Sequence, residues 1–154
     1  MSKARQEGQV GGLEAVAFGM LVLVMGVLII GNAWGVIDAR TAASQGAREA
    51  ARVFATAPVR GDAEADALAK DAAAATLQQL GWHRAGTTVR RTEGTFARCS
   101  LVTYEVEIPV PVLRLAWLRS GFSVFRARAA HTERVDPYRS GIPGTGPAVC
   151  TGAG

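Results

Sequence analysis

The chain has 154 residues, of which 49% are hydrophobic and 19% are charged, and its formal net charge is +4. This length allows one modest domain. The arginines are scattered and form no recognisable binding module, which argues against a nucleic-acid-binding protein. The strongly apolar residues are concentrated near the N-terminus, where the first predicted element lies.

A continuous apolar segment runs from Ala15 to Ile37, without a charged residue and with Asn32 as its only strongly polar side chain. As a helix it would be roughly 34 Å long, enough to cross a hydrocarbon core of about 30 Å. We therefore predict a transmembrane helix over residues 13–37, in contact with the lipid bilayer. A buried helix of a soluble protein would need a larger apolar core than the rest of the chain offers. A cleaved secretory signal ending near Ala39 would ordinarily have a shorter apolar core.

The chain is short on the N-terminal side of this helix and long on its C-terminal side. We expect the short tail, residues 1–12, in the cytoplasm and the long C-terminal part outside, although the flanking charges give only a weak positive-inside signal. Cys99 and Cys150 agree with an oxidising compartment, where they form either a disulfide or two unrelated thiols. The predicted location is the cytoplasmic membrane, in a single pass.

Beyond the apolar segment the helical spacing continues, with apolar residues on one face at Ala43, Ala47, Ala50 and Phe54. We predict one helix from Leu13 to Ala55, ended by Pro58 and Gly61. A second helix is predicted over residues 62–80, with acids in its first turns, where the helix dipole favours them. Its predicted apolar stripe comprises Leu68, Ala72, Ala75 and Leu80.

The period then changes to two, which predicts β-strands. Apolar residues alternate with polar ones at Val102, Tyr104, Val106 and Ile108. A second alternation begins at Phe125, and a weaker strand covers residues 87–91. We expect Glu105 and Glu107 to face Arg126 and Arg128 across an antiparallel pair. The predicted fold class is α+β, with a long N-terminal helix, a second helix and a small antiparallel sheet of about three strands.

The predicted extracytoplasmic α+β domain covers residues 38–139. Its apolar connector, residues 110–118, either folds over the sheet or forms an exposed patch that touches the membrane or another subunit. The last residues, 140–154, are rich in glycine and proline and are predicted to be a disordered tail.

Motifs for catalysis and for cofactor binding are missing from this sequence. His83 and His131 do not belong to a metal-spaced set, and there is no phosphate-binding loop, Cys-x-x-Cys pair or nucleophile elbow. The acids at 62, 64 and 66 are better explained as helix-start residues than as a catalytic pair. We therefore expect neither enzymatic activity nor a cofactor or metal.

The distinctive features lie in and beside the apolar helix. Small residues recur there with the spacing that lets another helix approach closely in lipid, at Gly12, Gly19, Gly26, Gly31 and Gly35. Either these glycines form a packing stripe or their spacing is chance in a glycine-rich chain. Glu14 stands at the mouth of the apolar run, as a solvated helix-start acid or as one half of a charge pair between subunits.

The segment 8–18, the apolar run, Asp38-Ala-Arg and Ala47-Arg-Glu-Ala-Ala-Arg52 together resemble TadE-like proteins, pilin-like components of Flp (Tad) pilus systems. The resemblance is best over residues 8–55. It implies a non-enzymatic subunit that is held in the cytoplasmic membrane by its N-terminal helix and packs with similar subunits. It also implies that Glu14 pairs with a neighbouring subunit's N-terminal amine.

The cleavage site of prepilins is not matched in full. Their peptidase cuts after a glycine and leaves the glutamate fifth, whereas counting back from Glu14 places Gln9 before the cut. A cut after Gly8 would place Glu14 sixth.

Two functions follow from the sequence. The first is a minor pilin-like subunit of a Tad/Flp-type pilus or a related type II or type IV secretion machine. Its expected partners are other pilin-like subunits and the Tad assembly machinery, in a homo- or hetero-oligomer formed through the helix. The alternative is a membrane-anchored extracytoplasmic binding or envelope accessory module unrelated to pili.

Overall fold

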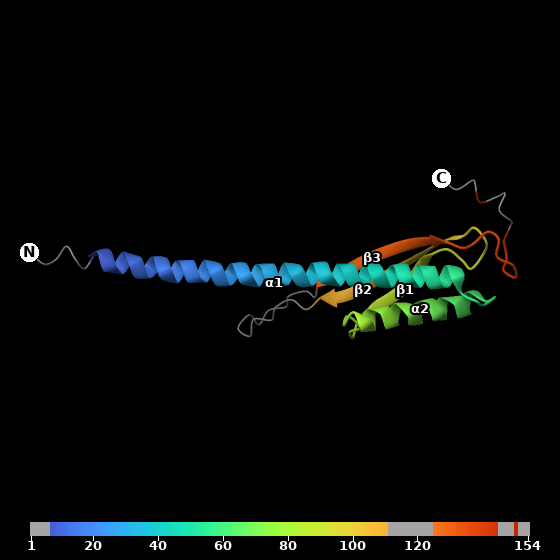
Figure 1. Cartoon of the computed structure of the whole chain (residues 1–154), viewed down its shortest axis with the longest axis horizontal. Helices are drawn as coiled ribbons and strands as arrows, with labels where there is room; N and C mark the ends of the chain where they lie inside the picture. The colour runs from blue at the N-terminus through green and yellow to red at the C-terminus, as the bar shows by residue number, and fades with distance from the viewer. Residues whose placement is uncertain (1–6, 111–124, 145–149, 151–154) are drawn as a thin grey trace, which may run out of the picture. The chain divides into compact units, whose positions relative to one another are not determined.

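The computed structural model describes residues 7–110, 125–144 and 150. Its elements are α1 (Glu7–Thr56), α2 (Asp62–Gln79), β1 (Thr88–Glu93), β2 (Leu101–Val110) and β3 (Phe125–Arg134) (Figure 1). The predicted α+β fold, with a long helix, a second helix and a three-stranded antiparallel sheet, is confirmed. The chain divides into two units at Gly35 and Val36, and each unit is described separately below.

The sheet of the second unit has the order β1-β2-β3, with β2 in the centre. Val106 pairs with Val89 of β1 and with Ala129 of β3, and the β2–β3 ladder ends at Val110 and Phe125. Along β2 the predicted alternation is confirmed, because its inward-facing side chains are fully buried at Val102, Tyr104, Val106 and Ile108. Successive side chains of a strand point to opposite faces, so this pattern gives the sheet one buried face.

The C-terminal half of α1 and the antiparallel helix α2 supply the rest of the core. The predicted face of α1 is confirmed: its four apolar residues are fully buried at Ala43, Ala47, Ala50 and Phe54. Phe54 is the largest of them, and its ring packs edge-on against Phe96 with 5.2 Å between centroids. The small alanines let the backbone of α1 come near its neighbours, and Phe54 fills the wider space at the end of the helix.

The predicted apolar stripe of α2 is wrong. Leu68 and Leu80 are 38% and 41% exposed, and the buried residues are instead Ala65, Ala69, Ala73 and Leu77. Gly46 of α1 explains the choice, because a Cβ there would lie 3.3 Å from two side-chain atoms of Leu77. Two helices this close require small side chains between them, so size rather than hydrophobicity selects the buried face of α2.

The predicted charge pairing across β2 and β3 is confirmed for Glu107 and wrong for Glu105. Arg126 and Arg128 both bind the carboxylate of Glu107, at 2.7 and 3.1 Å. Glu105 pairs instead with Arg90 of β1, at 2.8 Å, because the register places it opposite Ala130 of β3.

The predicted start of the disordered tail, at residue 140, is too early in the chain. Ile142 is buried in the main core cluster, and Pro143 accepts a 2.9 Å hydrogen bond from the backbone N–H of Arg98. Residues 140–144 are therefore part of the folded domain, held by one apolar side chain and one backbone bond. Residues 145–149 and 151–154, and most of the apolar connector 110–118, lie outside the described residues.

Candidate membrane-spanning and assembly helix

The N-terminal half of α1 exposes apolar side chains around its whole circumference. An 18-residue window of this helix has a mean hydropathy of 2.4, and none of it is buried within the chain. Large apolar side chains are half or more exposed here, as in Phe18, Leu23, Ile30 and Trp34. The protein therefore has a helix near its N-terminus that is long and apolar enough to cross a membrane.

Exposing such an apolar surface to water is unfavourable in free energy. Leaving one large apolar side chain in water instead of burying it costs about 1.5–3 kcal/mol. The exposed side chains of this segment therefore represent a cost on the order of 20 kcal/mol, which exceeds the net stability of about 5–15 kcal/mol of a typical small domain. Within the described residues, no part of the chain covers these side chains.

The five glycines named from the sequence all lie in α1. At Gly19, Gly26, Gly31 and Gly35 an added Cβ would meet no described atom within 4 Å apart from the neighbouring backbone of its own helix. Among the residues that the structure describes, no other segment packs closely against these glycines. Gly46 shows the contrasting case, since its missing side chain is what lets Leu77 approach, and sequence reasoning did not single it out.

Helix geometry divides these glycines into two groups. Residues seven apart on a helix are offset by only about 20°, so Gly12, Gly19 and Gly26 share one face. At about 100° per residue, Gly31 and Gly35 lie roughly 120° and 160° from Gly19, the middle residue of that face. The small residues thus offer two separate surfaces for another helix.

The polar side chains of this segment are few. The side-chain amide of Asn32 donates a 3.2 Å hydrogen bond to the carbonyl of Leu28, one turn earlier. An amide bonded to its own helix is less costly in an apolar environment than an unpaired one. Glu14 is exposed and begins the candidate span.

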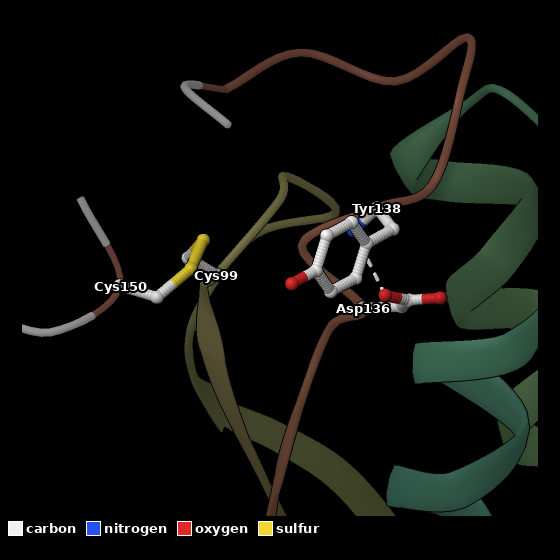
Figure 2. Close-up of a disulfide and its surroundings, with 4 residues drawn as sticks. All are labelled: Cys99, Asp136, Tyr138 and Cys150. Carbon is white, nitrogen blue, oxygen red and sulfur yellow. Dashed lines mark hydrogen bonds between the residues drawn. A yellow bond between two sulfur atoms is a disulfide. The ribbon is translucent and has the colours of Figure 1, made fainter. Parts of the chain in front are cut away.

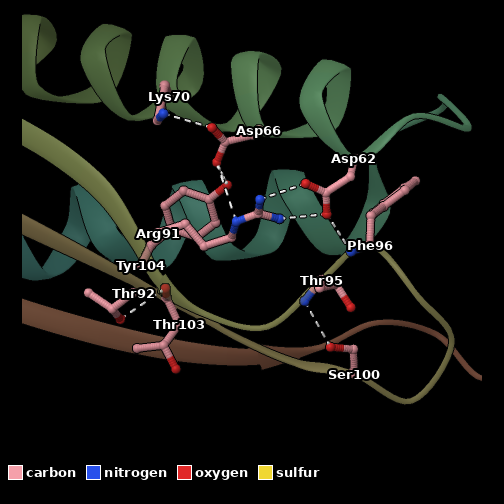
Figure 3. Close-up of polar contacts among 10 residues, drawn as sticks. All are labelled: Asp62, Asp66, Lys70, Arg91, Thr92, Thr95, Phe96, Ser100, Thr103 and Tyr104. Atoms are coloured by element: carbon pink, nitrogen blue, oxygen red, sulfur yellow. Dashed lines mark hydrogen bonds and ion pairs between the residues drawn. The ribbon is translucent and has the colours of Figure 1, made fainter.

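The acids at the start of α2 have a structural partner that the sequence did not reveal. The guanidinium of Arg91 in β1 donates two hydrogen bonds to the carboxylate of Asp62, at 2.7 and 2.6 Å (Figure 3). Asp62 also accepts a 2.7 Å bond from the backbone N–H of Phe96. The bond from Arg91 holds the pKa of the Asp62 carboxyl below its usual range.

Asp66, one turn further along α2, completes this network. It accepts one hydrogen bond of 2.6 Å from the hydroxyl of Tyr104 and forms an ion pair with Lys70 at 2.6 Å (Figure 3). Burial opposes ionisation of Asp66, but the bonds from Lys70 and Tyr104 outweigh it and lower its pKa. Burial raises the pKa of the Tyr104 hydroxyl. These groups fasten α2 to the sheet, and none is placed as a free acid or base.

A second polar contact joins α1 to the turn after α2. The indole Nε1 of Trp82 donates a 2.9 Å hydrogen bond to Asp38, and the guanidinium of Arg84 lies 4.8 Å from the centre of the Trp82 ring. The two residues are 44 positions apart, so no local sequence pattern predicts the contact.

Cys99 and Cys150 are joined by a disulfide (Figure 2). Cys99 lies in the connection between β1 and β2, and its backbone N–H donates a 3.1 Å hydrogen bond to Val135. The disulfide therefore ties residue 150 to the sheet domain at a distance of 51 residues in sequence.

Within the described ranges, no group of three or more His, Cys, Asp or Glu side chains is arranged to hold a metal ion. His131 lies 3.5 Å from Glu133 on the same strand, and His83 is exposed. Comparison of the chain with protein-family models, with curated proteins and with solved structures finds no match.

Proposed function

We propose that this protein is a minor pilin-like membrane subunit of a Tad/Flp-type pilus or a related type II or type IV secretion machine. In this proposal the N-terminal half of α1 lies in the cytoplasmic membrane and packs against the helices of other subunits. The α+β domain lies outside, and the protein acts by assembly rather than by catalysis.

The observation that carries the proposal is the double character of α1. One continuous helix has an N-terminal half that no residue of the described chain covers and a C-terminal half whose apolar face is the centre of a folded domain. A plain anchor needs only apolar length. This helix also carries two glycine faces that are unused within the monomer, at Gly19 with Gly26 and at Gly31 with Gly35.

The resemblance of residues 8–55 to TadE-like proteins gives the proposal its particular machine. Glu14, exposed at the beginning of the span, is the residue that would pair with a charged group of a neighbouring subunit. A carboxylate at that depth is costly without a partner, so such a pair would favour association.

Exchange of the span tests this proposal against a plain anchored module. Residues 15–35 are replaced by an unrelated apolar helix of equal length without glycine, and co-purification with the neighbouring membrane proteins is measured. The pilin-like role predicts membrane insertion with loss of those partners. Retention of all partners would show that the outer domain recognises them and would contradict the role of the helix.

A further inference from the structure

The folded domain has one end at which four elements meet. Val36 and Ala39 of α1 pack there with Val110 of β2 and Ala127 of β3, and Trp82, just after α2, joins the same cluster. Figure 1 shows the C-terminal end of α2, the arrowhead of β2 and the beginning of β3 at this end of the sheet. The domain begins here, so this end is the first part of it that follows the apolar segment.

Large apolar side chains stand exposed around this cluster. Ile37 is 61%, Leu80 is 41% and Phe125 is 51% exposed. They lie in α1, at the C-cap of α2 and in β3. A single exposed apolar residue would need no explanation, but here three come together at one end of the domain. An apolar group at one end of a domain fits the boundary between lipid headgroups and acyl chains.

The charges beside these residues are mostly positive. Arg40 and Arg84 are exposed, and Arg126 and Arg128 share the one carboxylate of Glu107. Asp38 is the other carboxylate of this group, and its hydrogen-bond donor, Trp82, is neutral. Among the described residues of this group, four arginines against two carboxylates leave two positive charges next to the exposed apolar side chains.

We propose that this end of the domain, formed by Ile37, Leu80 and Phe125 with Arg40, Arg84 and Arg126, docks on the surface of an anionic bilayer. The inference rests on the proposed membrane span and adds a second, reversible contact with the same membrane. The arginines bind the lipid phosphates, and the apolar side chains enter the boundary region. Each arginine near an anionic surface strengthens such a contact roughly fivefold.

The test uses the full-length, oxidised chain in nanodiscs, because its two native cysteines are then unavailable for labelling. A spin label is attached through Gln79→Cys, at the docking end of α2, or through Ala63→Cys, at the other end of the same helix and about 25 Å away. Both positions are exposed. Collision of the label with oxygen and with a soluble nickel complex measures its closeness to lipid.

In discs containing phosphatidylglycerol, the label at 79 should show the high oxygen-to-nickel ratio of the interface, and the label at 63 should not. Pure phosphatidylcholine discs, or the R84Q/R126Q variant, should lower the ratio at 79, because two arginines contribute about 25-fold to the docking equilibrium. The R48Q/R134Q variant changes the charge equally at exposed sites elsewhere and should leave it unchanged.

Equal ratios at 79 and 63 in anionic discs would overturn the docking proposal, and so would a ratio at 79 that does not respond to lipid charge. Failure of the wild-type chain to enter discs at all would instead refute the membrane span on which the proposal rests. The two failures are therefore distinguishable.

Discussion

Arg91 of β1 binds Asp62 of α2 through both of its terminal nitrogens, at 2.7 and 2.6 Å, and its guanidinium lies 4.8 Å from the centre of the Phe54 ring. One side chain thus connects the sheet, the start of α2 and the last turns of α1. The arginine is mostly buried, whereas the side chain of Asp62 is 43% exposed.

Replacing Arg91 by alanine should destabilise the folded domain by about 1–3 kcal/mol, since it removes a two-point ion pair and leaves Asp62 with fewer donors. The partial exposure of Asp62 favours the lower part of that range. Urea unfolding in detergent, followed by near-ultraviolet circular dichroism, measures the change. Arg90→Ala is the matched control, because Arg90 is 59% exposed and its loss should cost less than about 1 kcal/mol. Equal effects of the two variants would contradict a special role for Arg91.

The stability of the domain should decrease at low pH because of Asp62 and Asp66. Asp62 and Asp66 both have pKa values lowered by folding, so the unfolded chain binds their protons more readily. Their contribution is complete above the unfolded pKa of about 3.9 and is lost as the pH falls through the lower folded values. Stability should therefore be flat from about pH 7 to 5 with respect to these groups and fall below about pH 4. The D62N/D66N variant should be less stable at neutral pH and lose part of this acid dependence, and an unchanged acid slope would refute the assignment.

The disulfide should contribute measurably to stability. Its cysteines are 51 residues apart, and closure of such a loop in the unfolded chain corresponds to about 4 kcal/mol in the chain-entropy model. The C99S/C150S variant should unfold at lower urea concentration by up to that amount. Thiol alkylation followed by intact-mass measurement provides the direct check: the wild-type chain should accept no alkyl group until it is reduced. Alkylation of unreduced, folded protein at both cysteines would exclude the bond.

The buried alanine face of α2 predicts which substitutions destabilise the domain, and this prediction is opposite to the one from the stripe that contains Leu68. Ala69→Leu should destabilise the domain by about 1–3 kcal/mol through overpacking, because Ala69 is fully buried. Leu68→Ala should cost less than about 1 kcal/mol, since Leu68 is 38% exposed. Chemical unfolding of both variants compares them directly. A larger loss from the leucine deletion would mean that the stripe predicted from the sequence is the true core face.

The periodicity of the sequence was sufficient to predict the helices and strands and the buried faces of α1 and β2. The two-residue alternation of β2 and the alanines of α1 follow the backbone geometry of one element, so local pattern specifies them. The core face of α2 depends on the distance to α1, which Gly46 and Leu77 set together and which neither segment reveals alone. Long-range partners such as Arg91 with Asp62 and Trp82 with Asp38 lie 29 and 44 residues apart and required the fold.

The candidate membrane-spanning helix was likewise only partly predictable from the sequence. The length and composition of the apolar segment predicted a helix able to span a membrane, and the exposure of its side chains agrees with that role. Helix geometry, however, separates the glycines into two faces, which a count of small residues does not reveal.

Assembly of α1 with other helices through a glycine face can be measured by fluorescence energy transfer between labelled full-length chains in vesicles. The variant Gly19→Leu/Gly26→Leu is compared with Val22→Leu/Ile29→Leu, which keeps the same spacing at exposed, already large positions. If the glycine face mediates assembly, the glycine variant should weaken association about tenfold or more, on the scale of 1.4 kcal/mol per factor of ten, while the control should not. Energy transfer that is equal in both variants and in the wild-type chain would contradict it.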